Sequence, residues 1–108
     1  MDELNNVIRN ERCIIFCKRR CGFCDLADDF FMNHSLSCRK VMLEDFPGFV
    51  KPLQEKTDQT TLPNVFINGA PVGGYQQLVE KYDRCEQMKP NERDADVICM
   101  YLLKHQGV

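Results

Sequence analysis

Two periodicities alternate along the chain and predict its secondary structure. Short apolar or alternating runs bounded by turn residues predict strands at Cys13–Phe16, Arg39–Leu43, Asn64–Ile67 and Ala70–Val72. Apolar residues spaced three and four positions apart predict helices at Asp2–Glu11, Cys24–Asn33, within Phe49–Thr57, Tyr75–Tyr82 and Asp94–Lys104. The elements therefore follow the order α, β, α, β, α, β, β, α, α.

The connections between these elements predict the architecture. The first two strands flank a helix, and such a βαβ unit favours a parallel pair. Asn68-Gly69 is the strongest hairpin signal in the sequence and joins the last two strands as an antiparallel pair. Pro71 lacks a backbone N–H and suits an edge strand. We therefore expect an α/β fold, with a small four-stranded mixed sheet flanked by helices on both faces.

Length and composition limit the possible partners. The 108 residues suffice for one domain, which we expect to span residues 1–108. The formal net charge of −2 gives no overall attraction to nucleic acid or to an anionic membrane, and no apolar run approaches the ~20 residues of a membrane span. Seven cysteines are an odd number, and the N-terminus is too polar for a signal peptide. These features indicate a reducing compartment, so we expect a cytoplasmic protein with no nucleic-acid or membrane partner.

The most informative local pattern is Cys21-Gly22-Phe23-Cys24, at the junction of a predicted strand and a predicted helix. A Cys-x-x-Cys in this position is typical of a reactive dithiol. The unpaired N–H groups of the helix N-terminus and the basic run Lys18–Arg20 favour a thiolate there. Half of a zinc knuckle is the competing interpretation, and we disfavour it because a second Cys-x-x-Cys or a His pair at ligand spacing is missing.

The tetrad does not stand alone, and the combined pattern resembles the glutaredoxin family over nearly the whole chain. The resemblance rests on the element order, the Cys-x-x-Cys at the first βα turn, Thr61-Leu62-Pro63, and Gly73-Gly74-Tyr75. It implies a thioredoxin-like fold and a glutathione-dependent thiol–disulfide oxidoreductase that reduces protein or glutathione mixed disulfides. Cys21 would attack the disulfide, and Cys24 would be the resolving thiol. Thioredoxin itself fits less well, because the chain contains no Trp.

The resemblance also implies a glutathione site. A cis peptide bond before Pro63 would expose the backbone of Leu62 for pairing with a peptide. The residues that we expect to contact glutathione are Lys18 and Gln59 at its glycine end, Gly73, Gly74, Tyr75 and Gln76 at its γ-glutamyl end, and Phe23, Thr61, Leu62 and Pro63 between them.

The chain departs from the family pattern at Gln76-Gln77. Many members place Ser or Thr and then Asp after the aromatic residue, and that Asp can pair with the α-ammonium group of glutathione. Gln77 offers only a neutral hydrogen bond, which is roughly half as strong. We therefore expect weaker or altered glutathione binding.

A second departure lies inside the tetrad, where Gly22-Phe23 stands in place of the Pro-Tyr of the common dithiol motif. The Gly-Phe pair resembles the monothiol branch of the family, which binds a [2Fe–2S] cluster between two protomers through the first cysteine and glutathione. A cluster-binding homodimer ligated by Cys21 is therefore an alternative function, and otherwise we expect no metal. A further alternative is a reductant for one specific partner such as ribonucleotide reductase.

The remaining cysteines carry weaker expectations. Cys13 reads as a small apolar core residue, and Cys17 ends its strand close enough to modulate the dithiol. Cys38, Cys85 and Cys99 read as structural or incidental. Cys85 lies in a polar stretch, where oxidation could link two chains. We thus expect a monomer that dimerises only on cluster binding or through Cys85, with disulfide-containing or glutathionylated proteins as its substrates.

Overall fold

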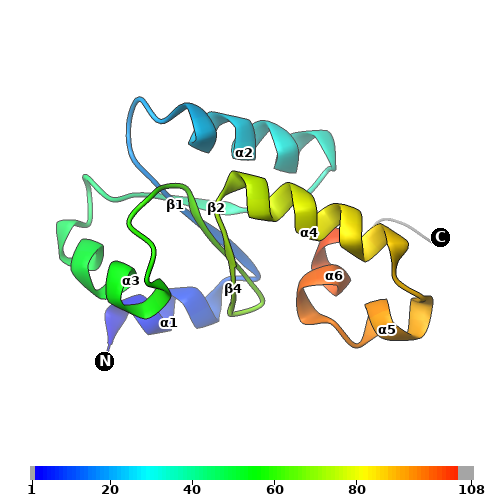
Figure 1. Cartoon of the computed structure of the whole chain (residues 1–108). Coiled ribbons are helices and arrows are strands. Elements are labelled where there is room, and N and C mark those ends of the chain that lie inside the picture. The colour runs from blue at the N-terminus through cyan, green and yellow to red at the C-terminus, as the bar shows by residue number, and fades with distance from the viewer. Residues whose placement is uncertain (1, 105–108) are drawn as a thin grey trace.

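The computed structural model describes residues 2–104, and its elements follow the expected order with two additions, a 3-10 helix in mid-chain and a short helix near the C-terminus (Figure 1). The elements are α1 (Glu3–Asn10), β1 (Cys13–Cys17), α2 (Gly22–Asn33), β2 (Arg39–Met42), the 3-10 helix η1 (Pro47–Phe49), α3 (Val50–Thr57), β3 (Asn64–Ile67), β4 (Ala70–Gly73), α4 (Tyr75–Gln87), α5 (Pro90–Asp94) and α6 (Val97–Leu102).

The four strands form one mixed sheet in the order β2-β1-β3-β4. Strand β1 runs parallel to β2 and antiparallel to β3, and β3 runs antiparallel to β4. The βαβ unit and the Asn68-Gly69 hairpin are therefore confirmed. Pro71 lies in β4, an edge strand, where the missing N–H costs no sheet hydrogen bond.

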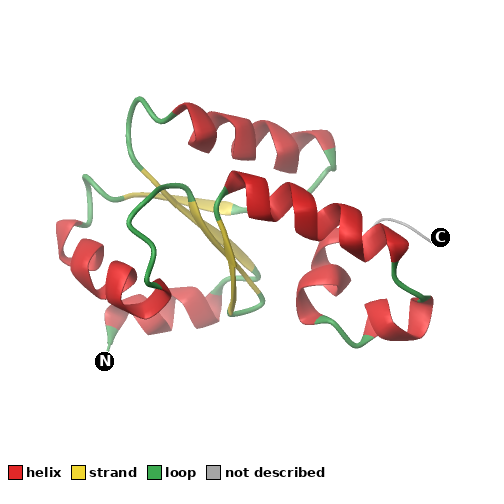
Figure 2. Cartoon of the chain, in the orientation of Figure 1, coloured by secondary structure: helices red, strands yellow, loops and turns green. Residues whose placement is uncertain are grey.

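The helices cover both faces of the sheet, as Figure 2 shows. Every residue of β1 is buried, and its side chains alternate between two hydrophobic cores. Ile14 and Phe16 pack with residues of α1 and α3. Cys13, Ile15 and Cys17 pack with residues of α2, α4 and α6. The expected architecture is confirmed, and it places the C-terminal end of β1 directly before α2.

The C-terminal part differs from the sequence prediction. Helix α4 continues to Gln87 instead of ending near Tyr82, since Cys85 is buried one turn beyond Tyr82 on the same face. The short helix α5 was not predicted, and Pro90 occupies its first turn. The last helix begins at Val97 because the Asp96 carboxylate accepts hydrogen bonds from the first free N–H groups.

Two disulfides, Cys13–Cys38 and Cys85–Cys99, join four of the cysteines. The prediction that Cys85 links two chains is wrong. Cys85 is 0% exposed and bonded to Cys99 of α6. The polar stretch around Cys85 hid an amphipathic helix in which Leu78, Tyr82 and Cys85 share the buried face. Cys13 is buried as expected, but as a disulfide partner and not as a free core thiol.

Cys17, Cys21 and Cys24 remain free.

Within residues 2–104, every helix is too short or too polar to cross a membrane.

Candidate active site

Cys21 occupies the N-cap position of α2, so its sulfur lies at the positive end of the helix. Arg20 turns the chain from β1 into the helix with a left-handed backbone (φ 57°), and Cys21 itself is extended. The backbone N–H of Cys24 donates a hydrogen bond to the Cys21 sulfur at 3.2 Å. The Cys21 sulfur therefore lies among hydrogen-bond donors at the start of a helix.

Cys24 has a different environment from Cys21. It is 1% exposed, and burial raises the pKa of its thiol to about 11, with the hydrogen bond to Cys21 as the second cause. Cys17 is also fully buried, and burial together with its hydrogen bond to Cys24 raises the pKa of its thiol far above the ordinary range. The expectation that Cys17 lies close to the dithiol is confirmed. Cys17 and Cys24 both stay protonated at neutral pH.

The loop before β3 faces the dithiol. The Leu62–Pro63 peptide bond is cis, as expected. The Cys21 thiol lies 3.7 Å from the Leu62 carbonyl oxygen and can donate to it. The Gln59 side-chain amide donates to the carbonyl oxygens of Thr61 (2.9 Å) and Pro63 (3.0 Å) and so holds the loop in place.

A cleft of about 520 Å³ opens around Cys21. It unites most of the residues predicted from sequence, namely Lys18, Cys21, Phe23, Thr61, Leu62, Pro63, Gly74, Tyr75 and Gln76, and it adds Thr60 and Gln77. Gln59 and Gly73 do not line this cleft, because Gln59 braces the loop and Gly73 ends β4. Thr60 carries no motif that could have identified it; only its place between Gln59 and Thr61 could have suggested it.

The start of α4 forms one wall of the cleft. Gly74 is the N-cap residue of α4, and its N–H donates to the Gln77 side-chain oxygen at 2.9 Å. Gly73 has φ +110°, and a Cβ there would lie 3.1 Å from the Gln77 side chain. Gln77 thus caps its own helix. Because the Gly74 N–H already donates to Gln77, it is not available to bind a ligand carboxylate.

Aromatic side chains form the rim next to Cys21. The Phe23 side chain is 63% exposed, and its ring centroid lies 6.3 Å from that of Tyr75. An exposed apolar rim beside a reactive thiol suits contact with the apolar parts of a substrate.

The basic loop before Cys21 is fixed by one acidic residue. The backbone N–H of Arg19 donates to the Glu44 carboxylate at 2.8 Å, and this hydrogen bond lowers the pKa of Glu44. Lys40 pairs with Asp28 of α2 at 2.6 Å, which offsets one of the acidic charges on that helix. Lys18 lines the cleft and supplies its positive charge.

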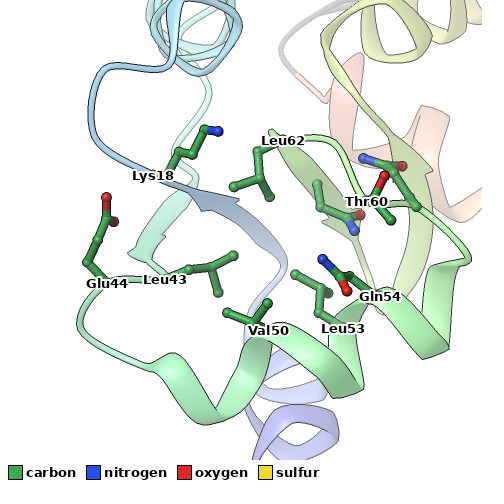
Figure 3. Close-up of a pocket in the computed structure, with 10 residues that line it drawn as sticks. Lys18, Leu43, Glu44, Val50, Leu53, Gln54, Thr60 and Leu62 are labelled. Carbon is green, nitrogen blue, oxygen red and sulfur yellow. The ribbon is translucent and has the colours of Figure 1, made fainter.

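A second pocket, of about 350 Å³, adjoins the cleft and shares Lys18, Thr60 and Leu62 with it. Figure 3 shows Leu43, Val50, Leu53 and Leu62 converging on this space, with Lys18 and Glu44 to one side.

Gln59 and Asn64 also line this second pocket. The Asn64 amide donates to the Thr57 hydroxyl at 3.0 Å, while its buried carbonyl oxygen has no protein partner. Because Thr57 already donates its only hydroxyl hydrogen to Leu53, it cannot serve that oxygen.

The cleft is lined by groups that can bind an anionic peptide. The cleft offers one cation in Lys18, exposed backbone at the cis-proline loop and the start of a helix, which are the groups that a small peptide with two carboxylates needs. Among residues 2–104, no three His, Cys, Asp or Glu side chains are grouped to hold a metal ion. An iron–sulfur cluster would therefore need ligands beyond Cys21.

Comparison with known proteins agrees with this geometry. The family model described as glutaredoxin matches residues 13–72. The mitochondrial glutaredoxin-2 of Bos taurus is 30% identical over 77 residues, which cover 68% of this chain and 49% of that protein. Glutaredoxin-C4 of Arabidopsis thaliana is 31% identical over 91 residues, covering 82% of this chain and 67% of that protein. The chain spans about half the length of the first curated relatives that it matches.

Solved structures show the same fold. The holo form of glutaredoxin C1 from Populus tremula x tremuloides superposes with a TM-score of 0.70 at 29% identity, covering 76% of this chain and 77% of that one. A buckwheat glutaredoxin–glutathione complex superposes with a TM-score of 0.72 at 25% identity, covering 91% of this chain and 83% of that one.

Proposed function

Because the chain belongs to the glutaredoxin family and has its thioredoxin-like fold, we propose that it is a glutathione-dependent thiol–disulfide oxidoreductase acting on glutathionylated proteins. The observation that carries this proposal is the position of Cys21, whose sulfur lines an open cleft and accepts the Cys24 N–H at a helix N-terminus. A relative that is 25% identical is described as a complex with glutathione, which supports the choice of co-substrate.

The one-thiol route uses Cys21 alone. Its thiolate attacks the glutathione sulfur of a mixed disulfide, and the protein thiolate leaves and takes up a proton. A second glutathione thiolate then attacks the glutathione sulfur on Cys21, which releases the Cys21 thiolate and forms glutathione disulfide. Overall, the mixed disulfide and one glutathione thiol become the protein thiol and glutathione disulfide, and the enzyme is unchanged.

The two-thiol route reduces a disulfide within a protein. Cys21 forms a mixed disulfide with one substrate sulfur, and the second substrate thiolate leaves. Cys24 loses its proton, attacks the Cys21 sulfur and displaces the first substrate thiolate, which leaves a Cys21–Cys24 disulfide. Two glutathione molecules then reduce that disulfide. Because Cys24 is buried and protonated at neutral pH, its deprotonation slows this route relative to the first.

Deglutathionylation kinetics of three proteins test the proposal: the unsubstituted chain, Cys21→Ser and Cys24→Ser. We expect Cys21→Ser to be inactive and Cys24→Ser to retain most of the activity. Activity in Cys21→Ser would contradict the proposal. Loss of activity in Cys24→Ser would instead favour a two-thiol reductant dedicated to one partner, such as ribonucleotide reductase.

Assembly around a [2Fe–2S] cluster is the second candidate, and the exposed Phe23 beside Cys21 favours it because an apolar rim suits contact with a second copy. When bound, the cluster would supply one-electron redox chemistry or iron–sulfur cargo, with Cys21 as the protein ligand. Anaerobic reconstitution with glutathione, iron and sulfide should then give a coloured dimer, and it should fail in Cys21→Ser. A colourless monomer would remove this candidate.

The return of Cys21 to the thiol requires a supply of reduced glutathione. We therefore propose the cytoplasm as the location and a monomer as the working form. Subcellular fractionation with an antibody to the chain would test the location.

A further inference from the structure

The Cys13–Cys38 disulfide lies at the opposite end of β1 from the dithiol. Cys13 begins β1, and Cys38 directly precedes β2, the parallel neighbour of β1. The two cysteines are 25 positions apart, and the loop that they close contains α2 with Cys21 and Cys24. This disulfide therefore joins the two ends of the segment that carries the reactive thiols.

The two disulfides of the chain differ in accessibility. Cys85 and Cys99 are both 0% exposed, and they lie in the core between α4 and α6. Cys13 is 3% exposed, whereas Cys38 is only partly buried and lines a surface pocket together with Cys13. Cys38 is therefore the more accessible point of attack for a nucleophile from solvent, since Cys85 and Cys99 are both 0% exposed even though Cys99 lines a pocket.

The pocket over this disulfide has a volume of about 530 Å³ and carries a positive charge. Arg12, Arg39 and Lys104 line it, against one acidic residue, Glu11, which pairs with Arg39 at 3.2 Å. Lys104 lies over the Tyr101 ring, 4.4 Å from its centroid, which holds the cation at the edge of the pocket. The volume is large enough for a tripeptide, and the excess cations attract an anion.

We propose that Cys13–Cys38 is a second thiol–disulfide exchange site, distinct from the dithiol, whose reaction partner is a small anionic thiol. The thiolate attacks Cys38, a bond forms between the two sulfurs, and Cys13 leaves as a thiolate that takes up a proton. A second thiolate then attacks the sulfur bound to Cys38, which releases the Cys38 thiolate and forms the disulfide of the small thiol. The protein disulfide gains two electrons, and two small thiols are oxidised.

Glutathione is the probe for this site, and the test uses the full chain with Cys21→Ser and Cys24→Ser. In that background the proposed enzymatic activity is absent, so the result does not depend on it. The folded protein is equilibrated with glutathione buffers of rising reduced fraction, quenched with acid, alkylated and mapped by peptide mass spectrometry. We expect Cys13 and Cys38 to become alkylated together while Cys85 and Cys99 stay oxidised. Reduction of both disulfides together, or no reduction of Cys13–Cys38 in the most reducing buffer, would overturn the proposal.

Single-cysteine variants in the same background test the point of attack. Cys13→Ser leaves Cys38 as a free thiol. We expect oxidised glutathione to form an adduct with Cys38 at about the rate at which it reacts with an exposed model thiol. Cys38→Ser leaves only the buried Cys13, which should react at least about tenfold more slowly. Equal rates, or faster reaction at Cys13, would overturn the assignment of Cys38 as the attacked sulfur.

Charge variants test the anionic class of the partner. Replacing Arg12 and Lys104 by Gln should slow reduction by glutathione about three- to tenfold, while the rate with neutral 2-mercaptoethanol changes less than about twofold. Lys51→Gln with Lys56→Gln, two exposed positions on α3, removes the same charge elsewhere and serves as the matched control. An equal loss in this control, or an equal loss with both thiols, would overturn the anionic assignment.

Discussion

The Cys24 backbone N–H donates to the Cys21 sulfur at 3.2 Å, so the two cysteines are linked through a hydrogen bond before any disulfide forms between them. The link is asymmetric. The Cys21 sulfur accepts a hydrogen bond and Cys21 lines the cleft, whereas Cys24 is 1% exposed and does not line it. The two thiols of one motif are therefore suited to different steps, attack and resolution.

This asymmetry predicts the order of alkylation in the reduced protein. The pKa of Cys24 is raised to about 11, so its thiol stays protonated and unreactive until the pH approaches that value. Iodoacetamide at pH 8 should label Cys21 and leave Cys24 unlabelled, and labelling of Cys24 should rise between about pH 10 and 11. Quantitative peptide mass spectrometry across pH measures this, with the urea-unfolded chain as the control in which both label alike. Equal labelling of the two at pH 8 in the folded protein would contradict the prediction.

Cys17 predicts a loss of stability in alkali. Its pKa is raised above the ordinary value of 9.0, so the folded state keeps the proton that the unfolded chain loses. The stability from the neutral thiol is complete below pH 9 and falls above it, by up to about 1.4 kcal/mol per pH unit.

Urea unfolding between pH 8 and 10.5 measures this slope in a background of Cys21→Ser and Cys24→Ser, in which Cys17 is the remaining free thiol. Cys17→Ala in the same background loses stability at every pH because it leaves a small cavity. The fall of its unfolding free energy with pH should correspond to about one proton fewer. Parallel slopes would show that Cys17 titrates alike in the folded and unfolded states.

The local parts of the site were accessible to sequence reasoning, because they depend on residues that are close in the chain. The Cys-x-x-Cys at a strand–helix junction, the Asn68-Gly69 hairpin and the edge position of Pro71 each follow from local backbone chemistry. The contact between Cys21 and Leu62 joins residues 41 positions apart, and only the family resemblance predicted it.

The disulfides could not be predicted from spacing, since pairing requires two Cα atoms within about 7 Å in the fold. Cys13 and Cys38 meet because β1 and β2 are parallel and in register, with Ile14 opposite Arg39. Cys85 was misjudged because the polar residues around it hid its buried helical face. The Gln77 cap of Gly74 depends on where α4 begins, and the family resemblance does not predict it.

Gly73 predicts a strong local effect of a single methyl group. Its backbone has φ +110°, and a Cβ would approach the Gln77 side chain to 3.1 Å. Gly73→Ala should lower the free energy of unfolding by roughly 1–3 kcal/mol because of backbone strain. Gly48→Ala is the matched control, since a Cβ there has no neighbour within 4 Å, and it should change stability by less than about 1 kcal/mol. Urea unfolding compares the two, and equal effects would show that the Gly73 conformation relaxes freely.

The Cys85–Cys99 disulfide predicts both stability and oligomeric state. Replacing both cysteines by Ala should lower the free energy of unfolding by about 3 kcal/mol, because the bridge closes a loop of 14 positions. No dimer linked through Cys85 or Cys99 should appear on non-reducing gels even after mild oxidation, since neither sulfur is exposed. A disulfide-linked dimer that disappears in Cys85→Ala would contradict this prediction and show that Cys85 links two chains.

Gln77 predicts how the cleft could bind glutathione more tightly. Its oxygen caps Gly74, so only its amide N–H groups remain, and these repel the α-ammonium group of a γ-glutamyl moiety. Gln77→Asp places a carboxylate at this wall of the cleft, where it also suits the first turn of α4. A charge-assisted hydrogen bond exceeds a neutral one by roughly 1 kcal/mol, so kcat/KM for a glutathionylated peptide should rise about fivefold, mainly through KM. Gln76→Asp adds the same charge one residue away and should give a smaller gain. If both variants gain equally, the effect is one of overall charge, and if Gln77→Asp gains nothing, the γ-glutamyl group does not bind at this wall.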